Sequence, residues 1–329
     1  MLGIGRRVVE ERSPLRRGDV VALRSAREIL ATLDEAASLE GVPFMPEMLA
    51  YFGRRFTVTA RVERACDTIT GSGPLRMQDT VLLDDLRCDG GAHEGCQAGC
   101  RIYWKEAWLR PVKTGEAHVS FAADDSLERL RSLAARSTRP ETRPDEEADV
   151  YRCQATELLR ATTPLGWWNA RSFSREVSCG NVSPWTFVRV SVRLVLEEIV
   201  WRLGLRKPIP FQRTGESQVE TPLWGVHPGQ TVRIRSAGDI RRTLDASGKL
   251  RGLWFDREML PYCGTQATVK TKVGRFVDEK SGAMVNLESD CVILDGVVCK
   301  GHRSRGRWFC PRAIYPWWRE AWLEPGSEA

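Results

Sequence analysis

The chain has 329 residues, of which 42% are hydrophobic and 28% are charged. This composition excludes a disordered chain or a fibre, and the length predicts about two domains. The net charge of +6 comes from 49 Lys and Arg against 43 Asp and Glu. Such a small excess excludes a protein whose whole surface neutralises phosphate, so any anion site must be local.

The first residues lack the apolar run of a signal peptide, and no later stretch of about 18 apolar residues predicts a transmembrane segment. We therefore expect a cytoplasmic protein of bacterial type. Disulfides do not persist in a reducing compartment, yet the chain has ten cysteines. Their number points to metal ligation, thiol chemistry or buried packing.

An internal repeat dominates the sequence. Residues 18–88 correspond without a gap to residues 229–299, at an offset of 211 that becomes 214 farther on. The pairs that anchor the alignment are Gly18 and Gly229, Cys88 and Cys299, Cys96 and Cys310, and Trp108 and Trp322. A repeat of this kind indicates a duplicated module.

Both copies show the pattern of short strands. In chain order the expected strands are Val20–Leu23, Phe56–Val62 and Val81–Leu86, and then Thr231–Ile234, Thr268–Val273 and Cys291–Val298. Alternating or short apolar runs between turn residues are typical of small β-barrels. The sequence therefore predicts a mainly β protein with a helical insert, built from two tandem SH3-like small β-barrels related by internal duplication, at residues 1–112 and 211–329. This fold analogy implies no activity.

Two different segments lie between the copies. Residues 113–150 have the composition of a flexible linker, with one short helix expected at residues 126–135. Residues 151–210 form a helical insert, in which Ser183 and Pro184 begin a helix that ends at Gly204. Its apolar residues predict packing across the barrels; a weak alternative is contact of helix 184–203 with a membrane surface, against which Glu197 and Glu198 argue.

The first copy contains the strongest candidate for a metal site. Its thiols are Cys66, Cys88, Cys96 and Cys100, and His93 lies among glycines that permit tight turns. Thiolates bind zinc and iron, so these five residues predict a zinc site or an iron–sulfur cluster. Four closing thiolates would favour zinc, and ligation by His93 in an exposed loop would favour a redox cluster. The alternative is a set of buried reduced thiols.

The second copy keeps only part of this set. Cys299 and Cys310 match Cys88 and Cys96, whereas Val277 and Ile314 replace Cys66 and Cys100. Two further thiols are Cys263 and Cys291. The second copy holds either a different set of four, Cys263, Cys291, Cys299 and Cys310, or a structural pair. The remaining Cys153 and Cys179 are expected to be buried thiols, although Cys153 could reach a site on a neighbouring barrel.

A basic aromatic loop replaces the first cysteine loop in the second copy. Its candidate anion-binding residues are Lys300, Arg303, Arg305, Arg307, Trp308 and Arg312. Guanidinium groups pair with oxyanions while aromatic rings stack on flat or sugar rings. The partner would be nucleic acid, an anionic glycan or an acidic protein; the alternative is a solvated hairpin.

The string from Cys88 to His93 is similar to the end of the CDGSH iron–sulfur domains, in which a Cys and a His hold one iron. The Cys-to-His spacing here is one residue longer and the upstream Cys-x-Cys pair is missing. The string is therefore an analogy for how a glycine loop presents both ligands. The wider signature, from Cys88 through Trp108, Tyr151–Leu158 and Cys310 to Glu320, resembles a family of bacterial proteins for which it implies no activity.

These observations favour a metal-binding accessory or binding protein over an anion-binding module. A third hypothesis is a thiol-dependent enzyme, in which His93 would activate Cys88 or Cys96. The sequence shows no third orienting residue or oxyanion hole, which favours a protein that is not an enzyme.

Overall fold

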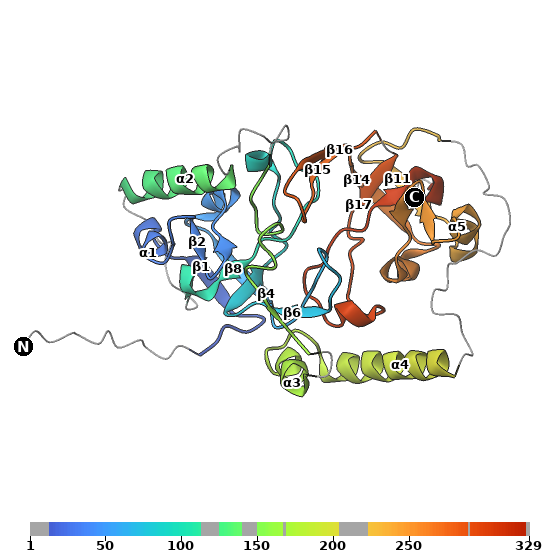
Figure 1. Ribbon diagram of the computed structural model, residues 1–329, viewed down its shortest axis with the longest axis horizontal. Coiled ribbons are helices and arrows are strands. Elements are labelled where there is room, and N and C mark those ends of the chain that lie inside the picture. Colours follow the sequence, from blue (N-terminus) through green and yellow to red (C-terminus); the bar gives the residue numbers. More distant parts are fainter. Residues whose placement is uncertain are drawn as a thin grey trace, which may run out of the picture.

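The computed structural model describes residues 13–112, 125–139, 150–166, 169–203, 223–288 and 290–326, and the backbone alone at Glu198, Trp201 and Arg305. The linker and insert boundaries at 113–124, 140–149 and 204–222 lie outside the described residues. Figure 1 shows the two halves side by side, the first in blue and the second in orange to red. Most of the described elements are short strands, so the described part of the protein is mainly β.

The first half contains a five-stranded antiparallel sheet with the order β8-β7-β4-β1-β9. Its strands are β1 (Val20–Leu23), β4 (Arg55–Arg61), β7 (Thr80–Leu83), β8 (Trp104–Lys105) and β9 (Leu109–Pro111). Between β1 and β4 lie α1 (Ala26–Leu30), β2 (Ser38–Leu39), β3 (Val42–Pro43) and the 3₁₀ helix η1 (Pro46–Tyr51). The helix α1 begins at Ser25, whose side chain forms a capping box with Glu28.

The second half contains a sheet of the same size with the order β18-β17-β14-β11-β19. Its strands are β11 (Thr231–Ile234), β14 (Gln266–Lys272), β17 (Cys291–Leu294), β18 (Trp318–Arg319) and β19 (Leu323–Pro325). Between β11 and β14 lie α5 (Ala237–Thr243), β12 (Lys249–Leu250), β13 (Leu253–Trp254) and η4 (Arg257–Tyr262).

The two sheets match in register as well as in order. Val20 pairs with Thr57 in the first sheet, and Thr231 pairs with Thr268 in the second. Each sheet has an irregularity at the same point, between Val58 and Ala60 or between Val269 and Thr271. The observed strands therefore follow the sequence correspondence.

Both cores also use the same aromatic contacts. Trp108 meets Phe44 edge to face at 5.3 Å between ring centroids, and Trp322 meets Phe255 at 5.3 Å. The indole Nε1 of Trp108 donates to Thr32, and that of Trp322 donates to Thr243, each at 3.0 Å. Such packing fixes the helix after the first strand against the end of the sheet.

Neither sheet closes into a barrel. In the described part of the chain, β8 and β9 occupy opposite edges of the first sheet, although only the 3₁₀ helix η3 (Glu106–Trp108) separates them along the chain. The equivalent helix η6 (Glu320–Trp322) connects β18 to β19. In place of the expected closed barrels, the described residues form open sheets, because the connection is too short for the two edge strands to form a ladder.

Smaller sheets extend from each half. A hairpin of β5 (Ala65–Cys66) and β6 (Pro74–Arg76) also pairs with β10 (Thr163–Pro164). The equivalent hairpin of the second half pairs β15 (Arg275–Val277) with β16 (Met284–Asn286). These two hairpins position the site described below.

Three helices lie between the halves in sequence: α2 (Asp125–Thr138), α3 (Ala170–Ser178) and α4 (Pro184–Arg202). The helix α4 begins where expected, because the Ser183 hydroxyl accepts from the Thr186 amide at 3.2 Å. Its buried residues Val190 and Leu194 pack with Phe309 of the second half.

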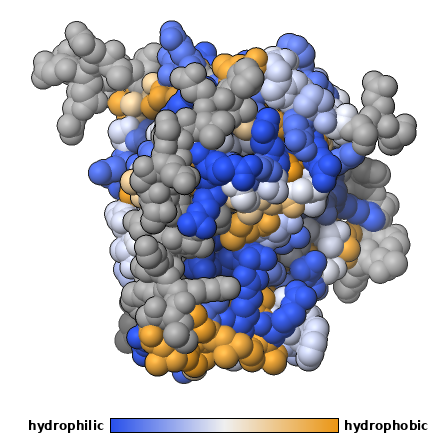
Figure 2. Space-filling model, turned by 90° about the vertical axis from the view of Figure 1, so that its right-hand side faces the viewer, coloured by the Kyte–Doolittle hydropathy of each residue, from blue (hydrophilic) through white to orange (hydrophobic). Residues whose placement is uncertain are grey.

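The outward side of α4 is apolar and exposed. This side carries Trp185, Val188, Val192, Val195, Leu196 and Ile199. Figure 2 shows the apolar strip along the lower edge of the molecule. Among the described residues, no helix is both long and apolar enough to cross a membrane.

Candidate metal centre between the two halves

Each half has a loop that contains a glycine and a short 3₁₀ helix. In the first half the loop contains η2 (Gly91–His93), and in the second it contains η5 (Arg305–Arg307). The Cys96 amide donates to the His93 carbonyl at 3.1 Å, and the Cys310 amide donates to the Arg307 carbonyl at 2.9 Å. Arg307 therefore occupies the position that His93 has in the first half.

The loop of each half rests on the hairpin of the other half. The Cys96 sulfur accepts from the Val277 amide at 3.4 Å, and the Cys310 sulfur accepts from the Cys66 amide at 3.2 Å. Gln97 adds three bonds to the β15 segment: its Oε1 accepts from the amides of Gly274 and Arg275, and its own amide donates to the Arg275 carbonyl. The contact is reciprocal, so the two halves clasp each other.

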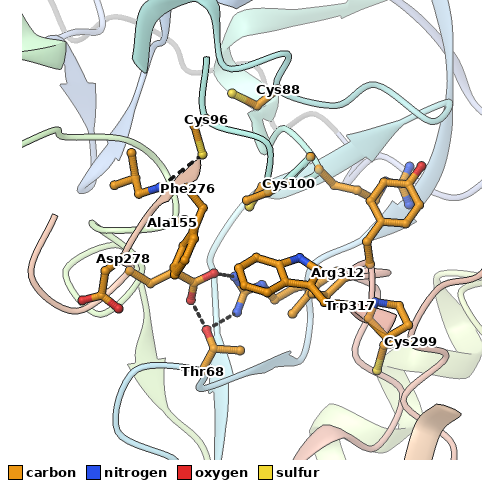
Figure 3. A pocket seen from close by; sticks show the side chains of 18 of the residues that line it. Thr68, Cys88, Cys96, Cys100, Ala155, Phe276, Asp278, Cys299, Arg312 and Trp317 are labelled. Atoms are coloured by element: carbon orange, nitrogen blue, oxygen red, sulfur yellow. Dashed lines mark hydrogen bonds and ion pairs between the residues drawn. The ribbon is translucent and has the colours of Figure 1, made fainter. Parts of the chain in front are cut away.

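A cavity of about 500 Å³ lies within this contact. Its walls include five thiols: Cys88, Cys96, Cys100, Cys153 and Cys299. Figure 3 shows Cys88, Cys96 and Cys100 on one side of the cavity and Cys299 on the other, with Arg312 and Trp317 between them. A cavity with this many thiols at a domain contact is the natural candidate for the functional site.

Four of these thiols, Cys88, Cys96, Cys100 and Cys153, come from the first half and from the segment after the linker. Burial is the largest cause of the raised pKa of Cys100, to which the neighbouring Cys153 and Cys96 also contribute. Burial likewise raises the pKa of Cys88 and of Cys153, with smaller contributions from Cys100 on the first and from Cys96 on the second. The four thiols Cys88, Cys96, Cys100 and Cys153 are therefore electrostatic neighbours, and we call them the thiol wall.

Gln154 holds Cys153 in place. Its Nε2 donates to the carbonyls of Pro43 and Tyr103 at 2.9 Å, and its Oε1 accepts from the Tyr103 amide at 2.7 Å. The amide side chain is buried, with all its strong hydrogen bonds directed at backbone. Cys153 is thus fixed beside the loop although it lies far along the chain.

A second group of ligands touches the thiol wall. Glu47 Oε1 lies 3.0 Å from His93 Nδ1 and 3.5 Å from Cys88 Sγ. One ligand atom from each of these three residues lies within 4.8 Å of the others, the single such set in the described part of the chain. Burial raises the pKa of Glu47, but hydrogen bonding and charge from His93 outweigh it and the pKa is lowered.

This group leaves two buried polar atoms unsatisfied. Among the described residues, neither Glu47 Oε2 nor His93 Nε2 has a hydrogen-bond partner, and His93 is 1% exposed. In the second half Glu258 accepts from the amides of His302, Arg303 and Ser304 with both oxygens. Buried orphan atoms in a native fold call for a ligand or another explanation.

The second half has a built-in cation at the equivalent place. Arg307 pairs with Asp256 at 2.8 Å and approaches Cys299 Sγ at 4.0 Å. Cys299 corresponds to Cys88, so a guanidinium stands where the first half has His93. An arginine side chain is always charged, so the second half carries a permanent positive charge where the first half has an imidazole.

The structure brings together only part of the ligand set expected from the sequence. Cys88, Cys96, Cys100 and His93 line the cavity, whereas Cys66 lies in β5 and contacts Cys310 on the loop of the second half. The sequence missed Glu47 as a site residue, and it gave Cys153 a place at a site only as the alternative to a buried thiol. The available signals were the recurrence of Glu47 as Glu258 and the presence of Cys153 in the quoted signature.

The thiols of the second half are spread over several elements, and Glu47 contacts both members of the expected pair of Cys88 and His93. In the second half Cys299 and Cys310 lie on the loop, Cys291 is buried in β17, and Cys263 lies at the end of η4. Cys88 donates to Glu47, which also bonds His93. No bond joins Cys88 to His93 within the described residues, so the arrangement differs from that of an activated cysteine nucleophile.

The basic aromatic loop is largely committed to internal contacts. Arg307 pairs with Asp256, and the fully buried Arg312 pairs with Glu279 at 3.1 Å. Trp308 and Phe309 pack against Phe173, and Lys300 lies over the ring of Tyr262. The Arg303 guanidinium is partly buried, and the side chain of Arg305 lies outside the described part.

Comparison of the chain with protein-family models, with curated proteins and with solved structures finds no match in any of the three.

Proposed function

We propose that the protein binds an iron–sulfur cluster through Cys88, Cys96, Cys100 and Cys153, and acts as a redox or assembly accessory protein. The observation that carries this proposal is the convergence of the four thiols on one cavity. Four cysteine ligands are the usual set for two-iron and four-iron clusters. Three of them come from the glycine-rich loop, and the fourth is brought in by the segment that Gln154 anchors.

The spacing of the sulfurs favours a cluster over a zinc ion. Bonds of 2.3 Å to one tetrahedral zinc would hold the sulfurs about 3.8 Å apart. No three thiol sulfurs of the described residues lie within 4.8 Å of one another. In a four-iron cluster each thiolate binds a different iron, so the ligands stand farther apart.

Burial and charge supply the chemistry of assembly. The raised pKa values keep Cys88, Cys100 and Cys153 protonated before loading, and iron binding converts these thiols to thiolates with release of protons. Loading should therefore become tighter as the pH rises. His93 lines the same cavity, and its buried Nε2 can donate to a cluster sulfur.

The test is purification and cluster reconstitution under anaerobic conditions, followed by iron and sulfide analysis and visible absorption spectroscopy. We expect charge-transfer absorption in the native chain and its loss in C153S. The matched control is C179S, which removes a buried thiol that does not line the cavity. Full iron and sulfide content in C153S, or none in the reconstituted native chain, would reject the proposal.

A second candidate is a zinc ion bound by Glu47, Cys88 and His93. It is supported by their mutual distances and by the orphan atoms Glu47 Oε2 and His93 Nε2. Three protein ligands beside a cavity would leave a fourth position open. E47Q should then abolish zinc binding, measured against a competing chelator, while C153S leaves it intact. Under the cluster proposal the result is the opposite: E47Q keeps the bound metal and C153S loses it.

We infer that the two sheets are copies of one SH3-like module. The inference is supported by the sequence correspondence, the common strand order and the matching register. Crystal coordinates in which the two halves failed to superpose, with Cys88 away from Cys299, would contradict it.

A further inference from the structure

Two thiols outside the thiol wall meet across the contact between the halves. Cys66 ends β5 of the first half, and Cys310 follows η5 of the second. The Cys66 amide donates to the Cys310 sulfur at 3.2 Å, and the residues are 2% and 5% exposed. At the reciprocal contact Val277 takes the place of Cys66 and faces Cys96. A thiol pair therefore occurs at one of the two equivalent contacts only.

A buried guanidinium stands beside this pair. Arg312 Nη1 donates to the Cys66 carbonyl at 3.1 Å and to Thr68 Oγ1 at 2.8 Å, and it lies 3.9 Å from Cys66 Sγ. Its Nη2 pairs with Glu279 at 3.1 Å, so its position is fixed from both ends. A fixed cation at this distance favours the thiolate form of Cys66.

The electrostatics of the two thiols are unequal. The hydrogen bond from Cys310 is the largest cause of the lowered pKa of Cys66, and Arg312 and Arg307 lower it further against the effect of burial. Burial raises the pKa of Cys310. One thiol of the pair is thus the nucleophile and the other its proton-bearing partner.

We propose that Cys66 and Cys310 form an oxidation site, in which a peroxide converts the two thiols into a disulfide that joins the halves. The Cys66 thiolate attacks one peroxide oxygen, the O–O bond breaks, and the leaving oxygen takes a proton to give water. The Cys310 sulfur then attacks the Cys66 sulfenic acid, and a second water leaves as the S–S bond forms. Two thiols and one hydrogen peroxide give one disulfide and two waters.

The surroundings restrict the oxidant. Neither sulfur lines the cavity, but Arg312, which lies 3.9 Å from Cys66 Sγ, does. A small uncharged molecule can pass where a bulky reagent cannot. Hydrogen peroxide should therefore oxidise the folded protein, whereas a maleimide should label Cys66 and Cys310 only after unfolding.

The experiment exposes the anaerobically purified full chain to one equivalent of hydrogen peroxide, quenches it in acid, and maps tryptic peptides by mass spectrometry. Cys66 and Cys310 fall in the separate single-cysteine peptides 65–76 and 308–312. We expect these peptides to be the main disulfide-linked pair, and to separate on reduction. Linkage of Cys66 to Cys299 instead, or oxidation confined to the thiol wall, would overturn the proposal.

Variants identify the nucleophile. In C310S, Cys66 should accumulate as a sulfenic acid that a dimedone probe traps when denaturant is added after the peroxide, whereas in C66S the probe added in the same way should not label Cys310. C263S serves as a matched control and should give the native linked pair. Equal labelling in the two variants would show that Cys66 is not the attacking thiol. None of these residues belongs to the thiol wall, so a failure here leaves the cluster proposal standing, and the reverse is also true.

Discussion

At the scale of single residues, Gly90 decides whether the first cysteine loop can close. Its φ is +75°, in the left-handed region, and a Cβ placed on it would overlap the backbone of Cys96. Gly95, in the same loop, has a φ of +80° but open space around the position of a Cβ. The two glycines have a similar φ and differ in the space available for a Cβ atom.

G90A should abolish cluster binding, because the backbone of Cys96 must move away from the thiol wall. G95A should keep the cluster and lose about 1–2 kcal/mol of stability, the cost of a left-handed Ala. Iron content and urea unfolding of the two variants measure the difference. Equal iron content in both would show that the close approach of Gly90 to Cys96 is not needed.

Glu176 is a buried carboxyl group away from the cavity. It lies in α3 and is 0% exposed, and its Oε2 accepts from Asn181 Nδ2 at 2.7 Å. Burial raises its pKa from 4.5 to about 8, against the lowering effects of Asn181 and Arg64. The folded protein therefore holds this carboxyl group protonated where the unfolded chain ionises it.

The contribution of Glu176 to stability should be complete below pH 4.5 and decline until about pH 8. Within that window the unfolding free energy should fall by about 1.4 kcal/mol per pH unit. E176Q keeps the acceptor for Asn181 and has no proton to lose, so its curve should lack this fall. Denaturant unfolding of both proteins at pH 5 and pH 8 makes the comparison; parallel curves would contradict it.

At the scale of elements, the loop segment after η2 joins the halves through its contact with β15. Gln97 Oε1 accepts from the Gly274 amide at 2.6 Å and from the Arg275 amide at 3.1 Å. The Gly274 amide lies at an exposed position and the Arg275 amide is partly buried, and both are held by this one oxygen atom. The amide side chain thus acts as part of the backbone network.

Q97A should lower the unfolding free energy by about 0.5–1.5 kcal/mol, because two backbone donors exchange their side-chain acceptor for water. Q97E retains a carboxylate acceptor and should lose less. Urea unfolding gives the values. A Q97A protein as stable as the native chain would show that water replaces the side chain without cost.

Elements that depend on local pattern could be predicted from the sequence. The expected strand Thr231–Ile234 is β11, and the helix after Ser183 is α4, because alternation and capping are encoded within a few residues. The grouping of the thiols could not be predicted from the sequence, because it depends on which loop contacts which hairpin. Cys66 faces the second half, and Cys153 enters the cavity in its stead, through contacts between distant segments.

At the scale of the whole molecule, the second half closes the cavity over the thiol wall. Phe276 and Trp317 pack edge to face at 4.7 Å between centroids, and both line the cavity. The ligands of the proposed cluster come from the first half and the segment after the linker. The second half therefore shields a site to which it gives no ligand.

F276A should bind the cluster but lose its iron to a chelator several-fold faster, because solvent gains access through the space left by the ring. W185A, which removes an exposed ring from α4, is the matched control. The rate is followed as bleaching of the visible absorption. Identical rates in F276A and the native chain would show that the second half does not shield the site.

The disulfide between Cys66 and Cys310 would close a loop that spans most of the chain. For a loop of roughly 245 residues, the loss of unfolded-state entropy amounts to about 5.5 kcal/mol. The oxidised protein should therefore melt at a higher temperature than the reduced protein in calorimetry. C310S should show the same melting temperature with and without peroxide. An unchanged melting temperature of the native chain after verified linkage would show that native-state strain cancels the gain.

The reciprocal clasp also gives the cavity a direction. In a pair of identical modules every side chain would occur twice, and a guest could enter in either of two equivalent orientations. Here Arg307 stands at the position of His93 and Arg312 at that of Ala98, and these two arginines are paired with Asp256 and Glu279. The two sides of this cavity are therefore not interchangeable, and a guest that binds the thiol wall can do so in one orientation only.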